Sequence, residues 1–161
     1  MTKPTVYIET SVLSYLTARP SRDLIVAGQQ QLTAEWWENA KDEYTLFVST
    51  VVVEEASGGN AEAAERRLES IVELDVLDVT DNAVQLAALL MQKGAMPPKA
   101  VQDALHVAVA SVHQVQYLLT WNYRHIANAT MREAINQICR EAGYTAPVIC
   151  TPAELGGENV D

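Results

Sequence analysis

The hydrophobic and polar residues of the chain alternate between two kinds of pattern. Short runs rich in β-branched residues, such as TVYI at residues 5–8, predict buried strands. Longer segments with apolar residues at helical spacing, opened by Ser, Thr, Asp or Asn, predict helices. Strands are expected at residues 5–8, 45–49, 74–79, 117–120 and 147–150, and helices at residues 11–16, 23–41, 50–57, 60–72, 81–93, 99–113 and 130–142.

Strands that alternate with helices predict an α/β sandwich around a mostly parallel sheet. A chain of 161 residues, 48% of them hydrophobic, has the length of one ordinary globular domain with a substantial core. We therefore expect a single domain over residues 1–155. The final residues 156–161, GGENVD, are expected to form a disordered tail.

Charge and composition narrow the function classes. The formal net charge of -10, from 21 acidic and 11 basic residues, argues against binding nucleic acid through a broad basic face. Any contact with phosphate should therefore be local or mediated by metal.

The sequence has no apolar run of membrane-spanning length and no signal-peptide core, so a cytoplasmic location is expected. Cys139 and Cys150 lack metal-ligand spacing and are expected to be small buried residues.

Acidic and amide side chains follow several of the predicted strands. Sites in parallel α/β sheets form beyond the carboxyl ends of the strands. Glu9 comes directly after the first strand, and Glu54 and Glu55 follow the second by five and six residues. Asn122 lies two residues past the strand YLLT. All four side chains are therefore expected to reach one edge of the sheet.

Asp103 begins the segment DALHVAVA, whose other positions are largely apolar. An unpaired ionised carboxylate in such a place is costly. An isolated Asp here would be read as a charge that stabilises the helix N-terminus. Together with Glu9 and the Glu54/Glu55 pair, however, it makes a set of acids from three segments. Clustered carboxylates repel one another unless a cation lies among them, and hard oxygen ligands suit Mg²⁺ or Mn²⁺.

Four segments of the chain carry a resemblance to a known family. In order and spacing, VYIETS, VSTVVVEEASGG, QDALHVAVAS and LLTWNYRHIAN resemble the signature segments of PIN-domain proteins, a metal-dependent ribonuclease fold that includes VapC-type toxins. The resemblance extends from about Thr5 to TPAEL, nearly the whole chain. It implies a three-layer α/β/α sandwich and a hydrolase that cleaves RNA internally at an acidic pocket with one or two Mg²⁺ or Mn²⁺ ions.

The resemblance also assigns candidate residues. Glu9 stands where the family usually has Asp, and Asn122 stands where Asp or Asn occurs. The extra methylene of Glu9 and the missing charge of Asn122 predict activity that is weak, Mn²⁺-dependent or lost. The implied catalytic and metal-binding residues are Glu9, Glu55, Asp103 and Asn122, and the implied supporting residues are Thr10, Ser11, Thr120 and Glu54, the last as the alternative to Glu55.

The implied mechanism needs no side-chain nucleophile. Metal ions held by the carboxylates would lower the pKa of a water molecule and neutralise charge on the phosphate. Arg19, Arg22, Lys99 and Arg124 could hold flanking phosphates, although a solvated surface charge is the simpler interpretation of each.

Several neighbouring residues have two interpretations. His106 lies one helical turn after Asp103 and is either a partner of a metal ligand or an ordinary buried histidine. His125 either contacts substrate or has a structural role. Trp121 either stacks on a base or covers the edge of the sheet.

The resemblance further implies an antitoxin partner and a homodimer. The antitoxin would lie near the first two helices, where Trp36 or Trp37 could anchor it. A rival hypothesis is a PIN-like module that binds RNA or protein without cutting, which predicts that Asp103→Asn leaves function intact. A phosphatase or phospho-receiver ranks lower, because ETS lacks an Asp-x-Asp arrangement and LLTWN offers no Lys.

Overall fold

A five-stranded, all-parallel sheet forms the centre of the computed structural model, which describes residues 2–156. The strand order is β3-β2-β1-β4-β5. The strands are β1 (Thr5–Ile8), β2 (Thr45–Ser49), β3 (Asp75–Leu77), β4 (Tyr117–Leu119) and β5 (Val148–Cys150). The helices are α1 (Thr10–Thr17), α2 (Leu24–Glu43), α3 (Thr50–Ala56), α4 (Ala61–Ser70), α5 (Asp81–Gln92), α6 (Val101–Val112) and α7 (Ala129–Glu141).

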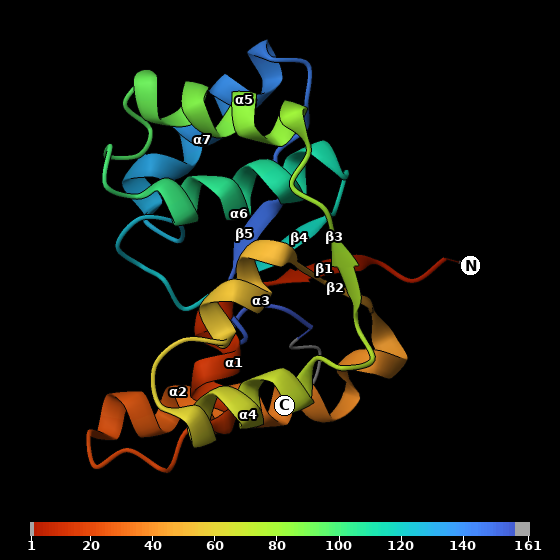
Figure 1. Cartoon of the computed structure of the whole chain (residues 1–161), viewed down its shortest axis with the longest axis vertical. Coiled ribbons are helices and arrows are strands. Elements are labelled where there is room, and N and C mark those ends of the chain that lie inside the picture. Colours follow the sequence, from red (N-terminus) through yellow and green to blue (C-terminus); the bar gives the residue numbers. More distant parts are fainter. Residues whose placement is uncertain (1, 157–161) are drawn as a thin grey trace.

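Helices cover both faces of this sheet. Figure 1 shows α5, α6 and α7 together on one side, and α1, α2 and α4 on the other. The expected three-layer α/β/α sandwich is therefore confirmed. The expected strand at 74–79 is shorter than predicted, because only Asp75–Leu77 pairs with β2 at the edge of the sheet.

The core lies on both faces of the central strand. Val6, Tyr7 and Ile8 of β1 have no exposed surface, as expected for a strand between two helical layers. On α6, the residues from Val107 to Ala110 are also fully buried. The nearly apolar helix predicted from DALHVAVA is thus buried on most sides.

The strand register explains how residues from distant segments meet. Ile8 pairs with Leu119 in the parallel ladder between β1 and β4. The next residue on each strand, Glu9 and Thr120, must therefore be neighbours at the carboxyl edge. The backbone N–H of Glu9 donates to the Leu119 carbonyl at 3.1 Å, which continues the ladder to the end of the strand.

The cysteines and the tryptophans of α2 are partly or fully covered. Cys139 and Cys150 are free and buried, as expected. Burial raises the pKa of both thiols, that of Cys150 to about 12, so neither is a thiolate near neutral pH.

Trp36 and Trp37 are both half-buried against the core, and Trp36 stacks on Tyr44 with ring centroids 5.7 Å apart. Their expected part in binding an antitoxin stays a prediction.

Two features bear on the boundaries of the chain. Residues 157–161, most of the segment expected to be disordered, lie outside the described residues. The domain bounds 1–155 therefore stay a prediction. Among the described residues, no helix is both long enough and apolar enough to span a bilayer.

A buried hydrogen bond ties α2 to the segment after β4. The Trp121 indole Nε1–H donates to Thr33 Oγ1 at 2.7 Å, and Thr33 Oγ1 donates to the Gln29 carbonyl at 2.7 Å. We expect Thr33→Val, which keeps the side-chain shape, to lower the free energy of unfolding by about 1–3 kcal/mol because the buried indole N–H loses its acceptor. Urea unfolding measures this loss.

Thr33→Ser is the matched control for that substitution, because it keeps the hydroxyl and should lose less stability than Thr33→Val. Equal stability of Thr33→Val and wild type would contradict the role given to this bond.

Candidate metal centre

Glu9 is the cap of α1 as well as an acid at the end of β1. Its carboxylate accepts hydrogen bonds from the Ser11 backbone N–H at 3.1 Å, the Ser11 hydroxyl at 2.5 Å and the Thr120 hydroxyl at 2.5 Å. Only 5% of Glu9 is exposed. The helix N-terminus and three donors therefore compensate a buried negative charge. A carboxylate has about four acceptor positions, so Glu9 keeps room for one more partner on Oε2.

Glu55 reaches the same edge from α3. Its Oε1 accepts from the Thr10 hydroxyl at 2.6 Å and lies 2.6 Å from His106 Nε2. Its Oε2 accepts no hydrogen bond from the described residues. Burial raises the pKa of Glu55, but the interactions with His106 and Thr10 outweigh it, and the pKa lies below its ordinary value. Glu55 is therefore ionised and has one oxygen free for a ligand.

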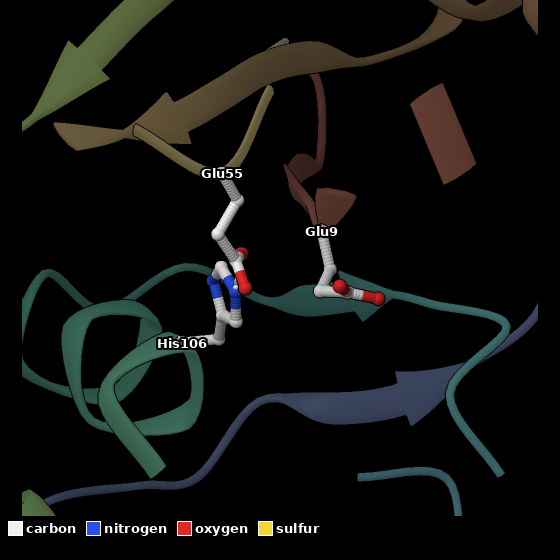
Figure 2. Close-up of side chains that lie close together, drawn as sticks. All are labelled: Glu9, Glu55 and His106. Carbon is white, nitrogen blue, oxygen red and sulfur yellow. Dashed lines mark hydrogen bonds and ion pairs between the residues drawn. The ribbon is translucent and has the colours of Figure 1, made fainter. Parts of the chain in front are cut away.

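Glu9, Glu55 and His106 form a cluster that could hold a metal ion. One ligand atom of each residue lies within 4.8 Å of those of the other two. Figure 2 shows Glu55 and His106 next to each other, with Glu9 beside them at the end of its strand. Two carboxylates this close repel each other, so a cation between them would be stabilising.

A chain of buried hydrogen bonds fixes His106 through Nδ1, the ring nitrogen that does not face Glu55. His106 Nδ1 lies 2.7 Å from the Tyr7 hydroxyl, which lies 2.7 Å from Ser49 Oγ. Ser49 Oγ in turn accepts from the Val52 backbone N–H at 3.4 Å. Burial raises the pKa of Tyr7 far above its ordinary value, and the charges of Glu9 and Glu55 raise it further, so this hydroxyl keeps its proton.

The direction of these bonds follows from counting protons. With a proton on His106 Nε2 and Nδ1 as an acceptor, Ser49 donates to Tyr7, Tyr7 donates to Nδ1, and Nε2–H donates to Glu55. In the reverse direction the Ser49 hydroxyl would have no acceptor among the described residues. As placed, His106 therefore orients the Glu55 carboxylate and presents no lone pair toward a metal.

Asp103 lies beside this cluster but has its own partners. It is the third residue of α6, and its side chain is 18% exposed. Asp103 Oδ1 accepts from Asn122 Nδ2 at 3.0 Å, and Oδ2 lies 2.8 Å from His125 Nδ1. Asp103 is not part of the three-residue group within 4.8 Å. The candidate site thus has two halves, the Glu9–Glu55–His106 cluster and the Asp103–Asn122–His125 cluster.

The two halves are connected through Thr120 and through α6. The Asn122 backbone N–H donates to Thr120 Oγ1 at 2.9 Å, and Thr120 donates to Glu9. Asp103 and His106 are one helical turn apart on α6, so they share a face of that helix. The side-chain oxygen of Asn122, Oδ1, accepts hydrogen bonds from the backbone N–H groups of Arg124 and His125. Its amide therefore faces Asp103, and a role as metal ligand stays a prediction.

The other expected residues divide into those at the cluster and those outside it. Thr10, Ser11 and Thr120 all donate to the carboxylates, as expected of supporting residues. Glu54 is exposed and stands outside the cluster, so Glu55 is the acid that α3 contributes. The expected phosphate-binding residues all have exposed side chains without hydrogen bonds to the described residues: Arg19, Arg22, Lys99 and Arg124.

Trp121 is 4% exposed and stacks on Tyr15 with ring centroids 5.8 Å apart. It therefore covers the edge of the sheet. His125, for which two interpretations were open, contacts Asp103.

Tyr7 and Ser49 contribute to the cluster without any signal in the sequence that singles them out. Each reads as an ordinary residue of a buried strand. The nearest signal is a hydroxyl at a position where a parallel strand is covered on both faces, since a buried hydroxyl needs a partner.

Comparisons with solved structures give the fold a precedent. VapBC2 from Rickettsia felis, solved bound to a DNA fragment from its promoter, has a TM-score of 0.58 at 14% identity, covering 91% of this chain and 98% of that one. VapC20 from Mycobacterium tuberculosis, a sarcin–ricin loop cleaving toxin, has a TM-score of 0.59 at 14% identity, covering 77% of this chain and 95% of that one.

No protein-family model matches the sequence, and no curated protein matches it either. At this level of identity the two likenesses concern the fold alone. They confirm the expected resemblance to VapC-type PIN proteins as a shared PIN-like α/β/α architecture.

The buried hydrogen-bond chain generates a stability prediction. We expect Tyr7→Phe to lower the free energy of unfolding by about 1–3 kcal/mol, because Ser49 and His106 Nδ1 then lose a buried partner. Denaturant unfolding measures the change. Tyr117→Phe is the matched control, since the Tyr117 hydroxyl makes no hydrogen bond to the described residues and should change stability by less than about 0.5 kcal/mol. Equal effects of the two substitutions would contradict the chain as drawn.

Proposed function

We propose that this protein is a metal-dependent endoribonuclease of the PIN-domain family, a hydrolase of RNA phosphodiester bonds that acts as the toxin of a toxin–antitoxin pair. The observation that carries the proposal is the convergence of Glu9 and Glu55 from separate segments at the carboxyl edge of the sheet. The PIN-like fold supports it, because the similar VapC20 cleaves the sarcin–ricin loop.

The donor set at this edge fits Mg²⁺ or Mn²⁺. Both ions prefer carboxylate oxygens, and Glu55 Oε2 and the remaining position on Glu9 Oε2 are available. Asp103 would join them by exchanging one of its present partners. A bound ion would supply Lewis acidity, lower the pKa of water and neutralise charge on a phosphate.

The protein's own residues prepare the carboxylates for that role. Thr10 and His106 hold one oxygen of Glu55, so its other oxygen keeps a fixed direction. Ser11 and Thr120 do the same for Glu9. Such outer partners set the orientation and basicity of metal ligands. Their removal commonly lowers metal affinity or activity by about tenfold to a hundredfold.

Electrostatics agrees with a metal-mediated contact to RNA. A protein with a net charge of -10 repels a phosphodiester at long range. A divalent cation among Glu9, Glu55 and Asp103 would offset two of their three negative charges and could bridge protein to phosphate. Asn122 lowers the negative charge of the site by one compared with an Asp at that position, so the affinity for the cation should be modest.

The partners follow from the proposed family. VapBC2 is a toxin–antitoxin complex, so an antitoxin protein is proposed as the partner of this chain and a homodimer as its assembly. The single PIN-like domain over residues 1–155 belongs to the same proposal.

One observation favours a second candidate function. Asn122 and His125 already occupy both oxygens of Asp103, so this acid can be satisfied without metal. A PIN-like module that binds RNA or protein without cutting would have this arrangement. It differs from the nuclease in that Asp103→Asn would leave its function intact.

Cleavage of a mixed structured RNA by the purified protein tests the proposal. We expect cutting with Mn²⁺ or Mg²⁺, none in EDTA, and a fall of at least about a hundredfold for Glu55→Gln and Asp103→Asn, because displaced reacting groups cost about that much. Glu38→Gln is the matched control, since Glu38 is an exposed acid on α2 without a side-chain hydrogen bond, and it should cut as wild type does. Equal cutting by the wild type and all three variants would mean that a contaminating nuclease cuts the RNA. RNA that stays intact with every protein would favour the module that binds without cutting.

A further inference from the structure

A cavity lies away from the acids, between α7 and the segment that leads into β5. Its volume is about 380 Å³. Arg132, Asn136 and Arg140 line one wall, and Tyr144 and Thr145 belong to the other. The first three are spaced by four residues on α7, so they project from a single face of the helix. A volume of this size falls in the range of small-molecule sites.

The charge of this cavity is opposite to that of the whole protein. Two guanidinium groups line it, and no carboxylate does. Neither arginine forms an ion pair with a carboxylate of the described residues. Glu141, beside Arg140 in the sequence, instead pairs with Lys93 of α5 at 3.2 Å. In a chain of net charge -10, two arginines on one helix face make this cavity locally basic, even though Arg140 also interacts electrostatically with Glu141.

Arg132 is held by the protein at one point only. Its Nη2 donates to the Ala127 carbonyl at 3.3 Å, and its Nε–H is buried without a hydrogen-bond partner. Buried N–H groups without acceptors are rare and costly. That Nε–H is covered by protein atoms, so an anion in the cavity would meet the other N–H donors of the guanidinium, a group that arginine commonly offers to phosphate.

The remaining lining residues match a nucleotide better than a bare anion. Tyr144 packs partly against the core and also borders the cavity, so a base bound there would lie next to an aromatic residue. Asn136 and Thr145 are exposed polar side chains with donors and acceptors for a base or a ribose.

The cavity is connected to the candidate metal centre through the loop after β4. The Arg132 side chain donates to the Ala127 backbone carbonyl. The Ala127 backbone N–H in turn donates to the Asn122 backbone carbonyl at 2.7 Å. Arg140 lies two helical turns further along α7, about 12 Å at the rise of an α-helix. The cavity therefore starts at the loop that carries Asn122 and His125 and leads away from it.

We propose that this cavity binds a nucleotide of single-stranded RNA, with Arg132 and Arg140 on its phosphates and Tyr144 against its base. The inference rests on the proposed ribonuclease function, and in that setting the nucleotide flanks the bond cleaved at the acids. It adds a basic, aromatic site that the exposed Arg19, Arg22, Lys99 and Arg124 do not provide.

Fluorescence anisotropy with a labelled single-stranded RNA of twelve nucleotides tests this site, in EDTA so that no cutting occurs. We expect the Kd to rise at least about tenfold for Arg132→Gln/Arg140→Gln, and the slope of log Kd against log salt to fall by about 1.4 because two single-strand phosphate contacts are lost. Arg140→Gln alone, at an exposed position, should give about half of that slope change. Tyr144→Leu should weaken binding without changing the slope.

Arg66→Gln is the matched control, because it removes the same charge from an exposed position on α4, in the opposite helical layer, and should bind as wild type does (Figure 1). The proposal would be overturned if Arg140→Gln and Arg132→Gln/Arg140→Gln both bound RNA with wild-type affinity. It would also be overturned if the wild type bound no RNA. Competition by inorganic phosphate as strong as that by the RNA would overturn it too, since the cavity would then be a site for a bare anion.

The two proposals fail in different ways. Loss of metal-dependent cutting with RNA binding intact would count against the nuclease and leave the cavity assignment standing. Metal-dependent cutting with an unchanged KM in the double arginine variant would count against the cavity and leave the nuclease standing.

Discussion

A buried carboxylate at the end of the central strand is the constraint on which the rest of this site depends. Glu9 is 5% exposed and keeps its place because the N-terminus of α1, Ser11 and Thr120 compensate its charge. The pairing of Ile8 with Leu119 brings Thr120 to it, so the register of β1 and β4 is part of the same arrangement. The acid at the strand end is thus a helix cap and a candidate ligand at once.

The other acids follow the same principle with different donors. Thr10 and His106 hold Glu55, and Asn122 and His125 hold Asp103. Each carboxylate therefore tolerates its burial without an ion, while Glu55 Oε2 stays open at the centre. A cation would add to a preformed site instead of assembling one, which reduces the reorganisation that binding requires. The same fixed donors make Asp103 the acid whose partners must change most.

The sequence predicted the α/β/α fold because the fold depends on local pattern and on topology, whereas the role of the acids as metal ligands stays a prediction. Buried β-branched runs indicated the strands, and the rule that carboxyl ends meet at one edge predicted that Glu9 and Glu55 lie near each other, as they do. The pattern could not show which way a buried side chain turns, so Tyr7 was only a strand residue and the Asn122 amide was not expected to face Asp103. Arg132 and Tyr144 line one cavity only because the chain after α7 turns back toward β5, which no local pattern encodes.

Anomalous X-ray scattering from crystals soaked in Mn²⁺ tests the metal centre most directly. The expected result is a peak at about 2.1 Å from carboxylate oxygens of Glu9 and Glu55, the distance that small hard cations keep, with His106 still donating to Glu55. The peak should disappear in crystals of Glu55→Gln and persist in Glu38→Gln. A wild-type crystal without Mn²⁺ at this edge, or with Mn²⁺ only at surface acids elsewhere, would contradict the account.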